Sequence, residues 1–242
     1  MKRTLFTALA VVVFMGVTYA QSNIRFGAKA GFNVSVFTKH LDDFGEGPQS
    51  YYYGFHKYPR FSVNAGFTAD VNISPKFVFG TELLYSGLGS AYRIKNDAVI
   101  ITTNRGTEDA YDYIKFRLNY LEVPLLAKYL FSNNPKNTSY TLYGGFAPAI
   151  NISKGIRYTY YDLNTDRPTN VPVKNQDEEI ENVKSFNVSG VLGIQIGTAP
   201  LARGFYFDMR LQQTLSPVFN SNAGLTKNPA MFAGSLGVGY RF

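Results

Sequence analysis

The sequence predicts an all-β fold, an eight-stranded antiparallel up-and-down transmembrane β-barrel. Apolar and polar residues alternate with a period of two along eight segments. The connections between these segments alternate strictly between short and long along the chain. No stretch after residue 20 is apolar enough to span a membrane as a helix. Tight turns at one end and long loops at the other are typical of barrels in the bacterial outer membrane.

The first twenty residues, 1–20, have the features of a secretory signal peptide. A short basic region precedes an apolar stretch from Leu5 to Val17, and small residues predict cleavage after Ala20. A membrane anchor is a weaker interpretation, because the stretch is shorter than the about 20 residues that a spanning helix needs. Residues 21–242 are expected to form one barrel domain in the cell outer membrane of a Gram-negative bacterium.

The composition limits the partners and the means of stabilisation. Removing the two basic residues of the predicted signal peptide from the 24 in the chain leaves 22, against 17 acidic residues, a net charge of +5. No basic cluster of the kind that nucleic acid requires is present, so no nucleic-acid partner is expected. The sequence has no cysteine, so an exported chain would rely on its core and its backbone hydrogen bonds and not on disulfides.

Residues 186–198 show the alternation most clearly. Val188, Leu192 and Ile194 take one face, and small or polar residues take the other. The eight predicted strands are 24–37, 61–73, 77–92, 118–131, 139–154, 186–198, 204–216 and 230–242. The short connections contain turn residues, whereas the long ones, near 38–60, 93–117, 155–185 and 217–229, are predicted to be extracellular loops.

One face of the predicted strands combines glycines with charged residues, and we expect this face to line the lumen. An eight-stranded barrel is only wide enough inside for side chains, so glycines there make room for large polar groups. The inward charges form a predicted lumen network of five basic and four acidic residues: Arg25, Lys29, Asp70, Glu82, Glu122, Lys128, Asp208, Arg210 and Arg241. The alternative is a soluble lipocalin-like barrel, but nine charges would be costly in its apolar cavity.

The segment at residues 120–131, Tyr-Leu-Glu-Val-Pro-Leu-Leu-Ala-Lys-Tyr-Leu-Phe, illustrates this assignment of faces. Its odd positions from Leu121 onward are apolar and are expected to face lipid, while Glu122 and Lys128 are expected to face the lumen. Pro124 also falls on the inner face. Its missing N–H predicts a bulge or a weakened strand pairing at this point.

Candidate catalytic residues are scarce. The two histidines, His40 and His56, fall in the first long loop with Asp42 and Asp43 near them, but no spacing matches a metal site or a catalytic triad. The acidic run at 177–181 is typical of a solvated loop. We therefore expect no enzyme activity, no metal and no cofactor.

The first long loop also holds a cluster of aromatic residues and cations. The cluster fits two interpretations equally, an interfacial aromatic belt or a contact surface for a protein, a glycan or lipopolysaccharide. The candidate contact residues are Tyr51, Tyr52, Tyr53, Phe55, His56 and Tyr58.

Three stretches resemble a known family. Gly-Ala-Lys-Ala-Gly-Phe-Asn-Val-Ser at 27–35, Tyr-Leu-Glu-Val-Pro-Leu-Leu-Ala-Lys-Tyr at 120–129 and Gly-Val-Gly-Tyr-Arg-Phe at 237–242 are similar to the PorT-like outer-membrane β-barrel family of Bacteroidetes. The resemblance implies an eight-stranded outer-membrane barrel and, for one member, an association with the type IX secretion apparatus. It implies no catalytic residues. The last strand, ending on an aromatic residue, also resembles the signal that the barrel-assembly machinery reads.

The expected role is structural or a surface interaction, without catalysis. The expected partners are outer-membrane lipid and lipopolysaccharide, the barrel-assembly machinery during biogenesis, and an extracellular or secretion-system protein. Three alternatives stay open: an accessory component of protein secretion, a narrow pore and a lipid-modifying enzyme.

Overall fold

The computed structural model describes residues 24–39, 55–103, 106–131, 138–161, 173–180, 182–220 and 228–242. The predicted signal peptide lies outside the described residues. The strands are β1 (Ile24–Phe37), β2 (His56–Tyr58), β3 (Arg60–Asn72), β4 (Phe77–Thr103), β5 (Gly106–Glu122), β6 (Leu125–Leu130), β7 (Ser139–Tyr161), β8 (Val173–Glu178), β9 (Phe186–Gly197), β10 (Gly204–Thr214) and β11 (Met231–Arg241).

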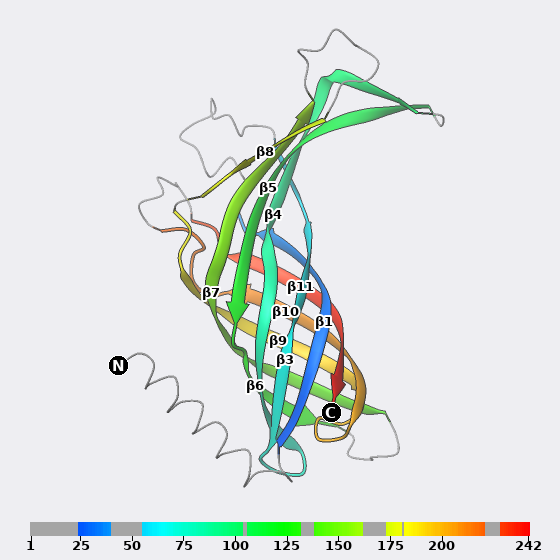
Figure 1. Ribbon diagram of the computed structural model, residues 1–242, viewed down its shortest axis with the longest axis vertical. Helices are drawn as coiled ribbons and strands as arrows, with labels where there is room; N and C mark the ends of the chain where they lie inside the picture. The colour runs from blue at the N-terminus through cyan, green and yellow to red at the C-terminus, as the bar shows by residue number, and fades with distance from the viewer. Residues whose placement is uncertain are drawn as a thin grey trace.

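These strands form one antiparallel sheet that closes on itself (Figure 1). β1 pairs with β3 on one side and with β11 on the other. From β3 the pairing passes to β4, to β5 and β6, and then through β7, β9 and β10 back to β11. Apart from the short β2 and β8, neighbours in this ring are also neighbours in sequence. The predicted all-β antiparallel, up-and-down fold is therefore confirmed, and closure leaves the ring without a free edge.

Two features explain why the described residues form eleven strands and not the eight expected. β5 and β6 occupy one place in the ring in succession, and the chain between them is interrupted at Val123 and Pro124. β2 and β8 pair with the far parts of β4 and β7, beyond the ring. The eight predicted segments correspond to β1, β3, β4, β5 with β6, β7, β9, β10 and β11.

Pro124 interrupts its strand as predicted. Because proline has no N–H to donate, the regular pairing stops there and resumes at Leu125. The neighbouring backbone groups keep partners: the Glu82 N–H donates to the Pro124 carbonyl over 3.2 Å, and the Val123 N–H donates to the Pro148 carbonyl over 2.9 Å. The interruption therefore leaves the wall of the barrel closed.

The two ends of the barrel differ. At the short-turn end, tight connections join β3 to β4 and β9 to β10, with the Ile73 N–H donating to the Phe77 carbonyl and the Thr198 N–H to the Phe205 carbonyl. At the opposite end, the extended end, β4, β5 and β7 continue past the other strands, as the upper part of Figure 1 shows.

The predicted loops at 93–117 and 155–185 are wrong over much of their length. The first forms the paired ends of β4 and β5, and the second contains the end of β7 and all of β8. We call this five-stranded extension of β2, β4, β5, β7 and β8 the projecting sheet. The other two predicted loops contain residues 40–54 and 221–227, which lie outside the described residues.

The outer surface of the ring is an apolar belt. Phe32, Phe67 and Phe205 leave 70 %, 67 % and 67 % of their surfaces exposed, and many others share this orientation. Aromatic rings gather at the short-turn end, where Phe205 packs on Tyr240 with ring centroids 4.7 Å apart. An outward apolar belt bordered by aromatic residues is the pattern of a barrel in lipid. In the part of the chain that the structure describes, no helix is long and apolar enough to cross a membrane.

The polarity of the two faces reverses in the projecting sheet. On β5 beyond Tyr120, the inward residues are the apolar Leu118, Phe116 and Ile114, all at most 5 % exposed. The outward residues on the same stretch are polar and half-exposed. Beyond the lipid, the outer face of a strand meets water, so the apolar face must turn inward to be buried.

Candidate functional site

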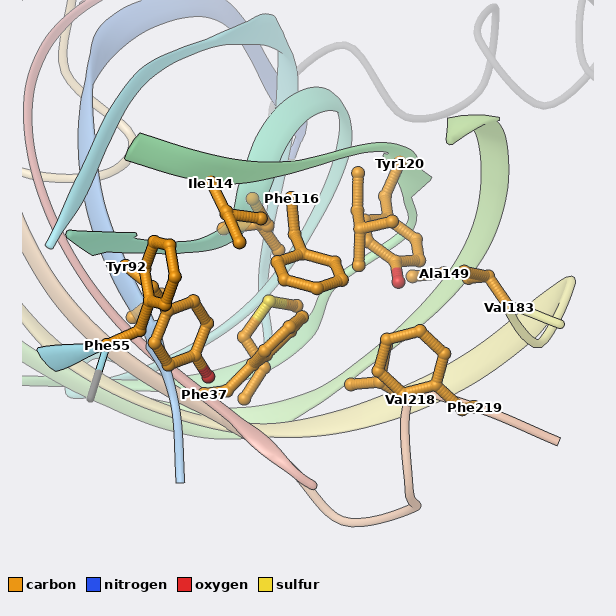
Figure 2. Close-up of a cluster of buried hydrophobic side chains, with 14 residues drawn as sticks. Phe37, Phe55, Tyr92, Ile114, Phe116, Tyr120, Ala149, Val183, Val218 and Phe219 are labelled. Atoms are coloured by element: carbon orange, nitrogen blue, oxygen red, sulfur yellow. The ribbon is translucent and has the colours of Figure 1, made fainter. Parts of the chain in front are cut away.

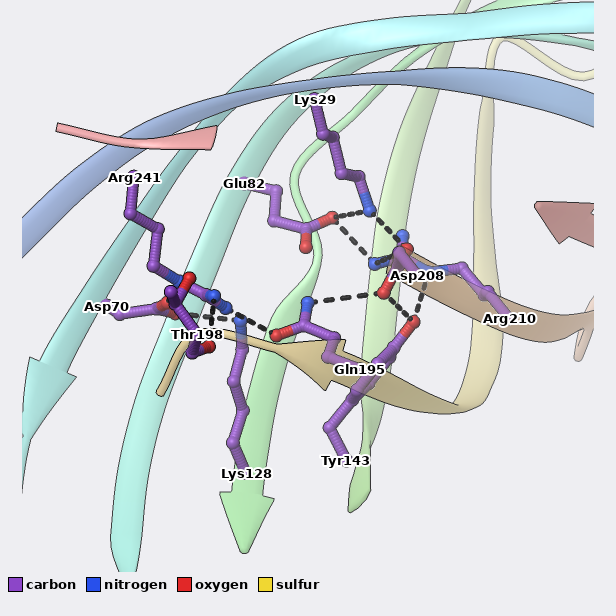
Figure 3. A network of polar contacts seen from close by, with 10 residues as sticks. All are labelled: Lys29, Asp70, Glu82, Lys128, Tyr143, Gln195, Thr198, Asp208, Arg210 and Arg241. Atoms are coloured by element: carbon purple, nitrogen blue, oxygen red, sulfur yellow. Dashed lines mark hydrogen bonds and ion pairs between the residues drawn. The ribbon is translucent and has the colours of Figure 1, made fainter. Parts of the chain in front are cut away.

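The lumen is filled by ion pairs arranged in layers (Figure 3). The layer nearest the short-turn end is centred on Asp70, whose Oδ1 lies 2.7 Å from Lys128 Nζ and whose Oδ2 lies 3.1 Å from Arg241 Nε. Arg241 Nη2 also donates to Gln195 Oε1 over 2.6 Å. All three charged residues are almost fully buried, so each charge depends on its protein partners and not on water.

The next layer joins two carboxylates to two cations. Lys29 Nζ lies 2.9 Å from Glu82 Oε2 and 3.0 Å from Asp208 Oδ2. Arg210 Nη2 lies 2.7 Å from the same Glu82 oxygen. Tyr143 completes the layer: its hydroxyl donates to Asp208 Oδ1 over 2.8 Å and accepts from Arg210 Nε over 3.1 Å.

Glu122 forms a third layer toward the extended end, and its partners are neutral. Ser86 Oγ donates to Glu122 Oε2 over 3.1 Å, and Gln212 Nε2 donates to Glu122 Oε1 over 2.8 Å. Its environment therefore differs from that of Glu82, which contacts two cations.

Glycines on the inner face make room for large side chains, as predicted. Tyr143 lies across Gly193 of the adjacent strand, and Tyr206 lies across Gly239 in the same way. A Cβ on either glycine would overlap the tyrosine ring. The Tyr206 ring in turn supports the guanidinium of Arg241, with 3.8 Å between Arg241 Cζ and the ring centroid.

Apolar side chains fill the barrel interior at the extended end (Figure 2). Three rings form the centre of this apolar plug: Phe37 lies 5.4 Å from Phe116 and 5.8 Å from Phe219, between ring centroids. The remaining buried members are Phe55, Leu88, Tyr92, Ile114, Leu118, Tyr120, Ala149, Val183, Val218, Met231 and Ala233. The interior is thus polar within the belt and apolar beyond it.

The outer face of the projecting sheet alternates tyrosines with cations, and we call it the tyrosine–cation face. Arg93 Cζ lies 4.9 Å from the Tyr58 ring centroid and 4.8 Å from that of Tyr111. Lys115 Nζ lies 5.0 Å from the Tyr113 centroid. The face consists of Tyr58, Arg93, Tyr111, Tyr113, Lys115, Arg117 and Arg157.

Asp177 on β8 links two strands of this face. Arg157 Nε and Nη2 donate to its two carboxylate oxygens over 2.8 and 2.7 Å, and Arg117 Nη2 donates over 2.7 Å. The hydrogen bonds from Arg157, aided by the charge of Arg117, lower the pKa of the Asp177 carboxyl below its ordinary value of 3.8. The hydrogen bonds from Arg157 and Arg117 to Asp177 hold β8 against β7 and β5.

Eight of the nine residues predicted for the lumen network are buried in the barrel interior, four basic and four acidic. Arg25 is the exception. It lies at the rim of the short-turn end, where its Nε donates to the Leu201 carbonyl over 3.0 Å, although it stands directly opposite Asp70 in the pairing of β1 with β3.

The structure describes only part of the predicted loop contact surface. Tyr51, Tyr52 and Tyr53 lie outside the described residues, as does His40. Phe55 is a correction: it is buried in the apolar plug and cannot contact an external partner. His56 and Tyr58 lie on β2, with His56 exposed.

The structure adds exposed surface that the sequence interpretation missed. The sequence predicts a loop for Tyr113, Lys115 and Arg117. Apolar residues nevertheless alternate with them at a period of two: Ile114, Phe116 and Leu118. That alternation was a detectable strand signal.

Comparison with known proteins places the chain in a family. The model of the outer membrane protein beta-barrel domain matches residues 19–220. No curated protein matches the chain by sequence.

Several solved structures are similar to the chain at low sequence identity. Ail, the attachment invasion locus protein of Yersinia pestis, is 10 % identical, with 91 % of this chain and 99 % of that chain covered and a TM-score of 0.39. Neisserial surface protein A is 13 % identical, with 90 % and 97 % covered and a TM-score of 0.39. OprG of Pseudomonas aeruginosa is 14 % identical, with 91 % and 96 % covered and a TM-score of 0.39.

The family match covers most of the chain and agrees with the closed sheet, the apolar belt and the charged lumen. The chain therefore belongs to the outer membrane protein beta-barrel domain family, and it is an outer-membrane β-barrel protein.

Proposed function

We propose that this barrel is a closed, non-enzymatic surface protein whose projecting sheet contacts a partner outside the cell. In outer-membrane barrels the short turns lie in the periplasm and the long connections lie outside. By that rule the projecting sheet and its tyrosine–cation face stand on the cell surface.

The observation that carries this proposal is the two-sided construction of the projecting sheet. Its inner face packs on the apolar plug, while its outer face presents tyrosines and cations to solvent. Tyrosines give large contact areas at little cost in conformational entropy, and arginines add charge-assisted hydrogen bonds. A sheet whose inner face is packed on a core and whose outer face exposes tyrosines and cations is suited to binding a partner.

The interior supports a closed barrel and not a narrow pore. Salt bridges fill the polar layers, and the apolar plug lies beyond them. Among the described residues, no group of three His, Cys, Asp or Glu side chains could hold a metal.

Shortening the projecting sheet tests the proposal. Residues 93–113, which include Arg93, Tyr111 and Tyr113 of the tyrosine–cation face, would be replaced by a tight turn, and the purified protein would be probed on a panel of anionic and neutral polysaccharides and extracellular proteins. We expect the intact protein to bind at least one class and the shortened protein to bind none, with the heat-dependent gel mobility of a folded barrel retained. Equal binding by both proteins, or binding by neither, would contradict the proposal.

A role as an accessory of protein secretion is the second candidate, and it rests on the resemblance of residues 120–129 to PorT-like barrels of Bacteroidetes. In this chain that segment is the interrupted β5–β6 position of the barrel wall. Deletion of the gene should then block export of cargo proteins, and unchanged secretion would dismiss this role.

Export by a cleaved signal peptide is also part of the proposal. The basic region and apolar stretch of residues 1–20 support it. N-terminal sequencing of the protein from membranes should begin at Gln21, and a chain that begins at Met1 would show that no cleavage occurs.

A further inference from the structure

A hollow lies on the outside of the barrel, where the projecting sheet leaves the apolar belt. Its volume is about 860 Å³, and its lining includes Arg60, Tyr85, Arg117, Asn119, Ile152 and Lys154. We call it the basal hollow.

Strand register places the basal hollow at the border between lipid and water. Tyr85 pairs with Leu121, the last apolar outward residue of β5, and both are more than a third exposed. The next outward residues on β5 are Asn119 and then Arg117. At about 3.4 Å per residue, Arg117 stands about 13 Å along the strand from Leu121, less in height because the strand is tilted. This is the level of the lipid head groups and the region just above them.

A bulge in β7 shapes the hollow. The register between β5 and β7 shifts between Asn119 and Tyr120, so Asn151, Ile152 and Ser153 face two residues of β5. Asn151 Nδ2 bridges the carbonyls of Asn119 and Ser153 at 3.3 Å each. Ile152 remains 53 % exposed beside these amides. Bulges commonly re-aim side chains at functional sites.

The lining of the hollow is divided by chemistry. Tyr85 and Ile152 supply apolar surface continuous with the belt, whereas Arg60 and Arg117 supply positive charge. Asp177, Glu178 and Glu179 also line it, and Asp177 already accepts hydrogen bonds from Arg117 and Arg157. Cations, acceptors and amides together match a phosphorylated sugar, which carries both anionic oxygens and hydroxyl groups.

We infer that the basal hollow binds the phosphorylated sugar head group of a glycolipid in the outer leaflet. The acyl chains would lie along the apolar belt below, the phosphate would meet Arg60 and Arg117, and the sugar hydroxyls would meet Asn119 and Ser153. The placement in the outer leaflet rests on the orientation given in the proposed function. The site does not depend on the partner of the tyrosine–cation face, so the glycolipid proposal and the partner proposal can fail separately.

Native mass spectrometry of the full chain in detergent micelles tests the inference, with diphosphoryl lipid A as the probe. Phosphatidylglycerol and dephosphorylated lipid A are the comparison lipids. We expect preferential retention of diphosphoryl lipid A. In Arg60→Gln/Arg117→Gln its apparent affinity should fall about 25-fold, since each cation near an anionic lipid head group contributes about fivefold.

The matched control is Arg93→Gln/Lys95→Gln, which removes the same charge from β4 further out on the projecting sheet. Its affinity for lipid A should change less than about twofold. Heat-dependent gel mobility verifies that each variant is folded, and the single variant Arg117→Gln, expected to lose about fivefold, serves if the double variant does not fold.

Three results would overturn the inference. Folded Arg60→Gln/Arg117→Gln, or the single variant in its place, could bind lipid A as the unaltered protein does. The two double variants could lose affinity equally, which would indicate general charge attraction. Phosphatidylglycerol or dephosphorylated lipid A could bind as tightly as diphosphoryl lipid A, which would show that the phosphorylated head group is not recognised.

Discussion

Glu82 Oε2 lies between two cations, 2.9 Å from Lys29 Nζ and 2.7 Å from Arg210 Nη2, in an interior that excludes solvent. Each charge in this layer is stabilised by its neighbours, because burial has removed the water that would otherwise solvate it. The layer therefore acts as a unit: removing one member leaves the others as uncompensated buried charges.

Glu82→Gln should be strongly destabilising. Lys29 would keep Asp208, but Arg210 would retain only the longer 3.9 Å contact with that carboxylate. Breaking a buried pair from one side costs about 3–5 kcal/mol of unfolding free energy. Denaturant-induced unfolding of the barrel in lipid vesicles measures this loss. Glu108→Gln, at an exposed position of β5, should change stability by less than about 0.5 kcal/mol.

Glu122→Gln is the buried comparison for that experiment. Its hydrogen-bond partners are the neutral Ser86 and Gln212, so the substitution strands no ion-paired cation. We expect a loss of at most about 1.5 kcal/mol, the value of one hydrogen bond. A loss as large as that of Glu82→Gln would show that the specific ion pairs do not determine the stability of the lumen.

Among the strands, β11 offers a test of how glycines organise the lumen. Gly239→Ala would place a methyl group into the ring of Tyr206, and overpacking of this kind costs about 1–3 kcal/mol of unfolding free energy. Gly234→Ala, on the outward face of the same strand, is the control, since its nearest neighbour, Leu211 Cδ2, would lie 3.8 Å away. Vesicle unfolding should separate the two variants. Equal stabilities would mean that Tyr206 relocates at no cost.

β8 depends on one carboxylate, Asp177, at its end nearest the ring. Because the pKa of Asp177 is lowered in the folded chain, its contribution is present at pH values above the ordinary 3.8 and is lost as the pH falls through the lower folded value. Asp177→Asn should reproduce that loss at pH 7. Hydrogen exchange should then be severalfold faster in β8, while the ring strands are unaffected. Unchanged exchange in β8 would show that backbone pairing alone holds it.

The strands of the ring could be predicted from sequence because lipid outside and charges inside produce a long, regular alternation, as in β1 and β9. The sequence predicts loops for most of the projecting sheet because the polarity of the two strand faces is reversed there. Leu118 and Phe116 face inward, whereas Lys115 and Arg117 face water. An alternation with a period of two does not indicate which face of a strand lies inside. The basal hollow could not be predicted at all, because it depends on the register of β5 against β7 and on one bulge.

For the molecule as a whole, the interior contains two barriers of opposite chemistry. The ion-paired layers occupy the part surrounded by lipid, and the apolar plug closes the extended end. An ion entering at the extended end would have to cross a plug that offers it no hydration. From the short-turn end it would have to displace buried salt bridges.

The protein should therefore be electrically silent in planar lipid bilayers. The variant Phe116→Ala/Phe219→Ala removes two of the three central rings of the plug. Each such truncation costs about 3–5 kcal/mol in a packed core, so this variant should unfold more readily. It should still show no steady conductance, because the layers around Asp70 and Glu82 remain. Single-channel recording distinguishes the outcomes, with protein-free bilayers as the blank. Discrete openings of the unaltered protein would contradict a closed lumen, and openings confined to the variant would identify the plug as the sole seal.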